Sequence, residues 1–586
     1  MIQGKVAAAG RESIRPYMLA WLIACAILVV ANLSAISNFV IRDPDDMLRL
    51  LQVRDWLAGQ SWFDVSQHRM NPPEGAGTHW SRLVDLPIAG LILLTRPLLG
   101  AANAELAALV AVPLLTLGVV MALVAAITRR LLDREQAIFA SFVVPVTLIV
   151  THQLRPLRID HHGWQMALAL AALLAALDTD RRRSGLVGGA ALALWLSISL
   201  EGLPYAAAFA AVAAVRWLID PRESQRLVWT LASLAGLAAA LFAITRGLAW
   251  SLDHCDAVSP VHLAGLGIAA VGCALLTRWR SAALHWRIAG LGLAGAGALA
   301  AMAVLAPHCA AGPFEKLDPL VRDFWYLNIA EGLPLWTQEP VIVALVIALP
   351  LIGLAGSAVQ FQNASGERRP AWAVMLFMLA AATIVAVFVQ RAGAVANLFA
   401  IPGAVALFRL ARQRIDGWRS APMRLLGTLA SLLLVAPSIA AALVNSAVEG
   451  EAAAASRRPS SCLDRRQIQA LNRLPAGDVA APLDLGLGIL IHTDHRIVAS
   501  GHHRNAAAMR DLFLIFLSPP QEARALLERR SIDWLIFCPA MPEGGHYKRA
   551  APDGLWAQLD RGRIPAWLQP VELGGKPGLR VYRVTR

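Results

Sequence analysis

The sequence is poor in charge for its length. Only 16% of its 586 residues are Asp, Glu, Lys or Arg, whereas 57% are hydrophobic. Because soluble globular proteins carry about 25% charged and about 45–50% apolar residues, this composition excludes an ordinary soluble enzyme. It also excludes intrinsic disorder, which requires low hydrophobicity.

The apolar residues form continuous runs rather than an alternating pattern, which excludes a transmembrane β-barrel. Many runs reach the ~20 residues that a helix needs to cross a bilayer. We therefore predict an all-α polytopic membrane protein whose first partner is the lipid bilayer. The net charge of +13 does not indicate a nucleic-acid partner, because the arginines lie in short loops between spans and orient the protein.

The apolar run at 83–99 is short and is interrupted by Pro87, Arg96 and Pro97. If it lies on or dips into the membrane, all the basic loops fall on one side, as the positive-inside rule requires. The N-terminus lacks a small-residue cleavage site, so we interpret it as a first span rather than a signal peptide. About thirteen spans follow, with the N-terminus cytoplasmic: 17–40, 104–128, 137–153, 163–177, 185–200, 203–219, 227–247, 258–277, 287–306, 339–360, 371–389, 393–410 and 423–446.

Charged residues return after residue 446, and long apolar runs stop. We therefore divide the chain into a transmembrane domain, 1–446, and a C-terminal extracytoplasmic α/β domain, 447–586. The transmembrane domain contains a long first outer loop, 43–103, with the re-entrant or interfacial helix. In the outer domain we expect strands at 488–492, 496–499, 533–538 and 579–584, and helices at 520–530 and 555–561.

The sequence has six cysteines, and none has zinc-ligand spacing. Cys25 and Cys273 fall within predicted spans. Cys462 and Cys538 share the outer domain, where an oxidising compartment permits a disulfide. Cys255 and Cys309 lie in outer loops and can also pair.

In this topology, carboxylates and imidazoles from loops far apart in the sequence gather on the outer face, which indicates a site. The first outer loop begins with three acids that fit either a capped helix start or metal and acid–base chemistry. An arginine at the outer end of a span can bind a phosphate with two hydrogen bonds. The candidates are Asp43, Asp45, Asp46, Asp160, His161, His162, Glu331 and Arg391. Their carboxylates suit Mg²⁺ or Mn²⁺.

Four short motifs resemble the catalytic subunit of oligosaccharyltransferases, a GT-C class membrane glycosyltransferase, and most of all its archaeal form. They are Asp43-Pro44 followed by Arg49; the segment 71–85, which includes His79; Asp160-His161-His162; and Asn328-Ile329-Ala330-Glu331. Thirteen spans followed by an outer domain also match that family.

The resemblance implies that Asp43, Asp160 and Glu331 surround a divalent cation, assisted by His161 or His162. Arg391 resembles the arginine that holds the phosphate of a lipid-linked donor. Asp45 or Asp46 can take the role of Asp43. His79 and Arg49 are expected to contact the substrate, because they lie in the matching motifs.

The sequence also departs from the family. The tryptophan-rich motif that contacts the acceptor peptide has only a weak counterpart in Pro482-Leu483-Asp484-Leu485-Gly486, which keeps Asp484 and Gly486. Gln165 stands where the archaeal motif has Glu. The polar segment 493–505, which contains His503, either lines the path of the acceptor or forms a structural loop.

These features predict a transferase of polyprenyl-phosphate-linked sugars at the outer face of a bacterial inner membrane, metal-assisted and inverting, with an unknown acceptor. No Gly-rich phosphate loop indicates a nucleotide-sugar donor. One alternative is a GT-C enzyme that moves a single sugar to a lipid or cell-surface glycan. The other is a lipid-glycan transporter, although transporters place polar residues at the membrane midplane.

Overall fold

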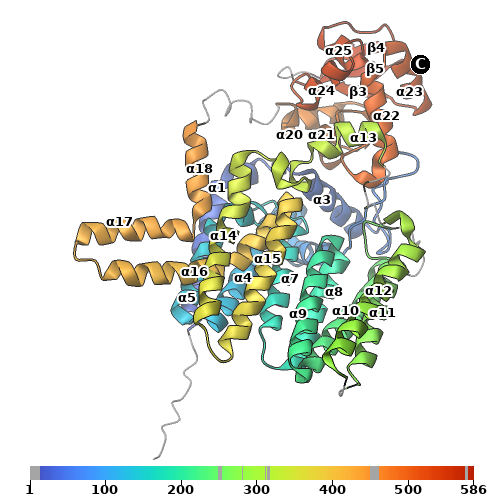
Figure 1. The fold of residues 1–586 in the computed structure, drawn as a ribbon. Helices are drawn as coiled ribbons and strands as arrows, with labels where there is room; N and C mark the ends of the chain where they lie inside the picture. The colour runs from blue at the N-terminus through green and yellow to red at the C-terminus, as the bar shows by residue number, and fades with distance from the viewer. Residues whose placement is uncertain are drawn as a thin grey trace, which may run out of the picture.

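The computed structural model describes residues 13–247, 254–279, 282–309, 312, 314, 317–448, 461–573 and 578–585. Long helices stand side by side, and the C-terminal part of the chain lies at one end of this bundle (Figure 1). The helices up to residue 448 are α1 (Arg15–Ala31), α2 (Leu33–Ser37), α3 (Pro44–Leu57), α4 (Asp85–Leu131), α5 (Arg134–Val143), α6 (Leu148–His152), α7 (His162–Ala176), α8 (Arg181–Ile198), α9 (Leu203–Ile219), α10 (Ser224–Arg246), α11 (Pro260–Leu276), α12 (Leu284–Leu305), α13 (Pro319–Phe324), α14 (Pro340–Asn363), α15 (Arg368–Phe388), α16 (Gly393–Asp416), α17 (Ala421–Ser431) and α18 (Pro437–Val448).

The predicted polytopic helical membrane fold is confirmed. Within the described residues, seven helices are long and apolar enough to cross a membrane, or eight if the bent pair α17–α18 is one span. Shorter apolar helices such as α1, α7 and α11 lie at other predicted spans. The expected total of thirteen stays a prediction.

The predicted short run at 83–99 is helical and continues into the next span as α4. This helix has 47 residues, which at 1.5 Å per residue is more than twice the thickness of a bilayer core. Its backbone is non-helical at Gly100, where φ is 75°, a value that glycine adopts easily. Gly100 therefore separates the first-loop part of α4 from its long apolar part.

Three predicted spans are wrong as continuous helices, and the first of them, 17–40, is divided at Asn32 into α1 and α2. The run 423–446 is split into α17 and α18, which are bent by 93°. The run 137–153 is split into α5, a 3₁₀ turn at Val144–Val146 and α6. Pro437 begins α18 and Pro145 lies in the turn. Proline has no N–H to continue the preceding helix, so these two breaks have a local cause.

The described residues after 460 form a five-stranded mixed sheet flanked by helices. The strands are β1 (Asp478–Ala480), β2 (Arg496–Ile497), β3 (Trp534–Phe537), β4 (Leu568–Val571) and β5 (Arg580–Val584), in the order β2-β1-β3-β5-β4. The helices are α20 (Arg465–Gln469), α21 (Leu483–His492), α22 (Ala506–Leu517), α23 (Pro520–Arg529), α24 (Glu543–Ala550) and α25 (Leu555–Asp560).

The strand predicted at 488–492 is wrong, because these residues belong to helix α21. β1 and β2 are parallel neighbours, and a parallel pair needs a crossover connection, which α21 supplies. The other three predicted strands and both predicted helices are confirmed within two residues at their ends.

The first outer loop is joined to this sheet. Met70 pairs with Ile497 at the free edge of β2, through hydrogen bonds from Asn71 N to Ile497 O and from Ile497 N to Arg69 O. One hydrophobic cluster includes residues of α3, α4, α21 and the sheet. The C-terminal part is therefore fixed on the segment 43–103 and packs on α3.

Both disulfides that the sequence permits are present. Cys255 pairs with Cys309, and Cys462 pairs with Cys538. Cys25 and Cys273 are free thiols within helices, as expected.

Candidate functional site

The acids that open the first outer loop have different environments. Asp43 caps α3 and accepts a hydrogen bond from Asp45 N at 2.9 Å. Asp46 is buried, whereas Asp45 is only partly covered. The sequence Asp-Pro-Asp-Asp favours this local structure, because Asp is a good N-cap and Pro is tolerated in the first turn.

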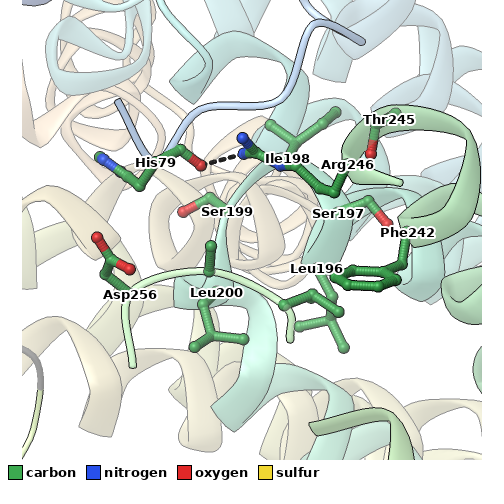
Figure 2. A pocket seen from close by; sticks show the side chains of 12 residues that line it. His79, Leu196, Ser197, Ile198, Ser199, Leu200, Phe242, Thr245, Arg246 and Asp256 are labelled. Carbon is green, nitrogen blue, oxygen red and sulfur yellow. Dashed lines mark hydrogen bonds between the residues drawn. The ribbon is translucent and has the colours of Figure 1, made fainter. Parts of the chain in front are cut away.

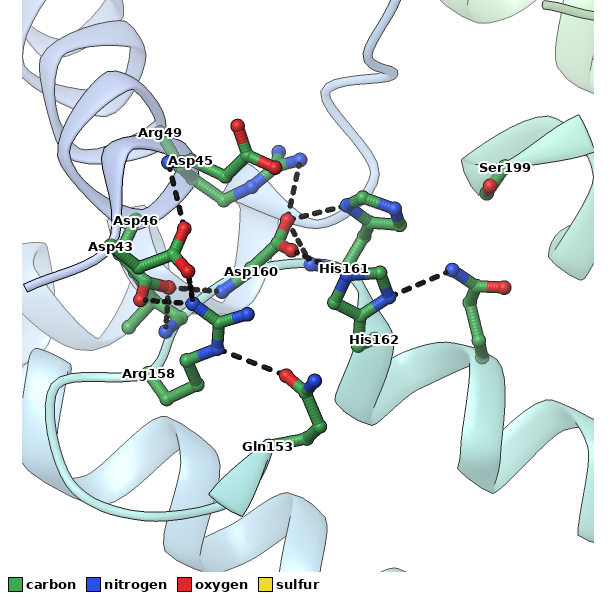
Figure 3. Close-up of polar contacts among 12 residues, drawn as sticks. Asp43, Asp45, Asp46, Arg49, Gln153, Arg158, Asp160, His161, His162 and Ser199 are labelled. Atoms are coloured by element: carbon green, nitrogen blue, oxygen red, sulfur yellow. Dashed lines mark hydrogen bonds and ion pairs between the residues drawn. The ribbon is translucent and has the colours of Figure 1, made fainter. Parts of the chain in front are cut away.

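Asp46 holds the second outer loop against α3 (Figure 3). Its carboxylate accepts hydrogen bonds from Ile159 N at 2.8 Å, from Asp160 N at 2.9 Å and from Arg158 at 3.1 Å. Arg158 also forms an ion pair with Asp43. Asp46 therefore anchors this loop to α3, and its catalytic role stays a prediction.

Asp160 and its two following histidines lie at the centre of the cluster (Figure 3). One oxygen of Asp160 accepts hydrogen bonds from the backbone N and from Nδ1 of His161. The other oxygen, Oδ2, lies 3.2 Å from Nε2 of His162. These two buried atoms are paired with each other, and neither has a hydrogen bond to another described residue.

Glu331 and Arg391 meet at the edge of the same cluster. Arg391 lies 3.5 Å from the Glu331 carboxylate and forms a second ion pair with Glu201. Glu331 lies in a 3₁₀ turn, Ala330–Gly332, whose backbone also contacts the turn that contains Arg391. Arg391 and Glu201 line a cavity of about 130 Å³ together with His162, Gln165 and Tyr205.

The electrostatics show that the predicted acids act on one another. Burial and the charges of Asp160, Asp43 and Glu331 raise the pKa of Asp45 well above its usual value. Burial also raises the pKa of Glu331, with contributions from Asp43 and Asp160. The pKa of Asp160 is lowered, because His161, His162 and Arg158 outweigh its burial. The structure therefore brings together acids from three segments that are distant in the sequence.

These residues fit a divalent cation. Asp160, His161 and His162 each offer a ligand atom, and these atoms lie within 4.8 Å of one another. The charges of Asp160, Asp45 and Glu331 act on one another, and a cation is the group that offsets such like charges. Of these three acids, Asp160 belongs to the group of close ligand atoms.

Gln165 determines which nitrogen of His162 carries the proton. Its oxygen accepts the indole N–H of Trp195 at 2.9 Å, so its amide nitrogen donates to Glu201 at 3.1 Å and to Nδ1 of His162 at 3.2 Å. A neutral His162 then has its proton on Nε2, facing Asp160. His162 is thus a weaker metal ligand here than the resemblance implies.

Arg49 and Trp80 pack against the cluster formed by Asp160 and His161. Arg49 is fully buried, lies 2.7 Å from Asp85 and 3.9 Å from Asp160, and stacks over the Trp80 ring. The contacts of Arg49 are those of a residue that positions Asp160, and its expected contact with substrate stays a prediction.

The other predicted substrate contacts lie outside this cluster. His79 and His503 belong to a second group of histidines, and His503 is paired with Asp256 at 2.6 Å. Asp484 starts α21 next to Glu543, which accepts a hydrogen bond from Leu483 N. The contacts of these three residues therefore do not include the Asp160 carboxylate.

The sequence placed Arg158 and Glu201 among the polar residues of the outer face and Trp80 in the motif 71–85, but it gave none of the three a specific role. Their contacts come from the tertiary structure: Arg158 pairs with Asp43, Glu201 pairs with Arg391, and Trp80 stacks with Arg49.

Comparison by sequence finds no matching family model and no matching curated protein. Comparison by structure finds the archaeal oligosaccharyltransferase AglB of Archaeoglobus fulgidus. The apo form is 15% identical with a TM-score of 0.68, over 94% of this chain and 73% of that one. The complex with an inhibitory peptide and a dolichol-phosphate is 16% identical with a TM-score of 0.64, over 95% and 73%. The complex with Zn and sulfate is 14% identical with a TM-score of 0.62, over 97% and 73%.

Identities this low establish similarity of fold and not of activity. The similarity nevertheless spans the helical bundle, the first outer loop and the C-terminal sheet region. The chain therefore has the fold of a GT-C class membrane glycosyltransferase of the archaeal oligosaccharyltransferase type.

Proposed function

We propose that this protein transfers a sugar or oligosaccharide from a polyprenyl-phosphate carrier, at the outer face of a bacterial inner membrane. The observation that carries the proposal is the meeting of Asp45, Asp160 and Glu331 beside Arg391, at the ends of apolar helices. Acids in this setting are costly unless a cation or a cationic substrate neutralises them. The solved relative bound to a dolichol-phosphate supports a lipid-linked donor.

The proposed orientation in the membrane rests on ion pairs that join the arginine-containing loops to one another. Arg130 lies 3.4 Å from Asp178, Arg181 lies 2.8 Å from Glu223, and Arg409 lies 2.6 Å from Asp133. These loops therefore gather at one end of the bundle. Because basic loops stay in the cytoplasm, the acidic cluster at the other helix ends and the C-terminal domain, 447–586, face outward.

The donor phosphate would occupy the cavity beside Arg391, whose guanidinium can donate two parallel hydrogen bonds to phosphate oxygens. The Tyr205 hydroxyl lines the same cavity and has no hydrogen-bond partner among the described residues. A divalent cation held by Asp160, Asp45 and Glu331, of the Mg²⁺ or Mn²⁺ class, would supply positive charge to the departing phosphate.

The acceptor attacks the anomeric carbon from the face opposite the phosphate, so the configuration inverts. The new bond to the acceptor forms as the carbon–oxygen bond to the phosphate breaks, and the phosphate leaves with the electron pair. The acceptor's proton passes to a carboxylate. Asp45 suits this role better than Asp43, because Asp43 caps α3 and is held by Arg158.

The acceptor differs from the peptide bound by the archaeal relative. Leu483 and Pro482 stand where that family's tryptophans contact the acceptor, and α21 buries Leu483 in the domain core. We therefore propose a glycan or lipid acceptor. The second candidate function is the transfer of a single sugar from a polyprenyl monophosphate donor to such an acceptor.

The test uses the full chain in nanodiscs with Mn²⁺, radiolabelled polyprenyl-linked sugars, as monophosphates and as diphosphates, and a bacterial glycan and lipid extract as the source of acceptor. We expect transfer of the label to the extract and release of the free polyprenyl phosphate or diphosphate by the wild type, with a loss of at least 100-fold in the Asp160→Asn variant. Asp494→Asn, an exposed acid in the C-terminal domain, is the control and should keep full activity. Equal turnover by wild type and Asp160→Asn contradicts the proposal.

A further inference from the structure

Three imidazoles from two distant parts of the chain form a compact group outside the carboxylate cluster. The ring centroids of His79, His502 and His503 lie 4.8–5.2 Å apart, so the rings form a nearly equilateral triangle. Each histidine offers a nitrogen within 4.8 Å of the others. The pair His79 Nδ1 and His502 Nε2 is only 3.2 Å apart.

The group is held in place by its surroundings. Asp256 accepts hydrogen bonds from Nε2 of His503 at 2.6 Å and from both sides of the Arg504 guanidinium at 2.7 Å. Arg504 in turn donates to the carbonyl of Thr78, the residue before His79. The neighbouring Cys255–Cys309 disulfide fixes the segment that carries Asp256. His79 and Asp256 line the same small pocket (Figure 2).

The chemistry of the group suits a metal ion. Imidazole binds a metal through an unprotonated ring nitrogen, and each of the three rings has a nitrogen within 4.8 Å of the others. The nitrogen of His502 that faces His79 is Nε2, so these two rings present nitrogens to one shared position.

The geometry also matches a tetrahedral metal. Nδ1 of His79 and Nε2 of His502 lie at hydrogen-bonding distance, 3.2 Å, which is close to the roughly 3.4 Å between two nitrogens bound to one zinc ion at 2.0–2.1 Å. His503 donates its Nε2–H to Asp256, which leaves Nδ1 available as a ligand. A carboxylate on the far nitrogen of a metal-bound histidine is a common feature of zinc sites.

We propose that His79, His502 and His503 bind a transition-metal ion of the zinc class, with Asp256 orienting His503. This site is separate from the carboxylate cluster and does not depend on the proposed transfer reaction. Its metal would tie the first outer loop to the C-terminal domain. Trp80, next to His79, lies between the two sites, 5.7 Å from His502 and 6.1 Å from His161 by ring centroids.

The experiment titrates the metal-free full chain in detergent with Co²⁺ alone, and then with Zn²⁺ in competition. We expect one equivalent of Co²⁺ with the intense visible absorption of tetrahedral coordination, displaced by Zn²⁺. His502→Ala should weaken this binding at least about tenfold, whereas Asp160→Asn, in the other cluster, should leave the spectrum unchanged. His68→Ala, an exposed histidine of the same loop, is the matched control.

X-ray absorption of the zinc-loaded wild type provides a test that needs no variant. We expect a first shell containing three imidazole nitrogens at about 2.0 Å. A shell of oxygens only, or a Co²⁺ spectrum that survives in His502→Ala, overturns the proposal. Loss of the spectrum in Asp160→Asn also overturns it, because the metal would then belong to the carboxylate cluster.

Discussion

The side-chain amide of Gln165 donates to Nδ1 of His162 across 3.2 Å, and Trp195 fixes the orientation of that amide by donating to its oxygen. This arrangement places the His162 proton on Nε2, toward Asp160. A glutamate at position 165 would favour the other tautomer of His162. Its carboxylate would accept a hydrogen bond from Nδ1–H, which leaves Nε2 without a proton and free to bind a cation.

We therefore expect Gln165→Glu to raise the affinity of the carboxylate cluster for Mn²⁺ by about 10–100-fold. Isothermal titration of the metal-free full chain with Mn²⁺ measures the change. Gln362→Glu, an exposed glutamine at the end of α14, adds the same charge far from the site and should change nothing. An unchanged or lower affinity in Gln165→Glu would show that the tautomer of His162 does not limit metal binding.

The second prediction concerns the contribution of Arg391 to the affinity for the lipid donor. Arg391→Ala should weaken binding of polyprenyl phosphate by about 1.5–3 kcal/mol, or about 10–150-fold, because a hydrogen bond to a charged group is lost. Arg391→Lys should recover only part of the affinity, since lysine lacks the planar fork. Fluorescence titration with the lipid in nanodiscs measures the effect, with Arg414→Ala at the other end of α16 as the control. Equal affinity of the alanine variant and the wild type would remove Arg391 from the donor site.

The Cys462–Cys538 disulfide joins the start of the described C-terminal region to the end of β3 across 76 residues. Replacing both cysteines by serine should destabilise this region by about 2–4 kcal/mol, because the unfolded chain gains freedom. Thermal unfolding followed by tryptophan fluorescence detects the loss, since Trp534 and Trp556 lie in the region. Cys25→Ser, a free thiol in α1, should leave the transition unchanged.

We expect the buried Glu543 to make the stability of the C-terminal region depend on pH. Burial and the nearby Asp484 raise the pKa of Glu543 to about 8 from its usual 4.5. The folded state therefore holds this proton over a pH range in which the unfolded state has lost it. Stability contributed by the protonated form is complete below about pH 4.5 and is lost as the pH rises toward 8.

Glu543→Gln should accordingly flatten the decline in melting temperature between pH 5 and pH 8.5. Glutamine keeps the acceptor for Tyr547, which donates to Glu543 at 2.8 Å. The exposed Glu522→Gln of α23 is the control. A variant that declines as steeply as the wild type would place the responsible group elsewhere.

Much of the fold follows from the sequence, because continuous apolar runs and arginine-rich loops report on the bilayer directly. The helix α16 and the disulfide pairs are examples. The errors occur where local composition is ambiguous. The apolar content of residues 488–492 predicts a strand. These residues form a helix instead, because the parallel pairing of β1 with β2 requires a crossover connection between the two strands. Proline determined the breaks at Val144–Val146 and Pro437, which apolar counting overlooks.

The sequence by itself determined that the chain is a membrane protein, and its acids in three separate loops indicated one site. Only the tertiary structure decided how those acids divide their roles. Asp46 anchors a loop, Asp43 is neutralised by Arg158, and Asp45 remains available, although all three are adjacent in the sequence. The reason is physical: a carboxylate's chemistry depends on its neighbours and its burial, and these come from distant segments that local sequence does not specify.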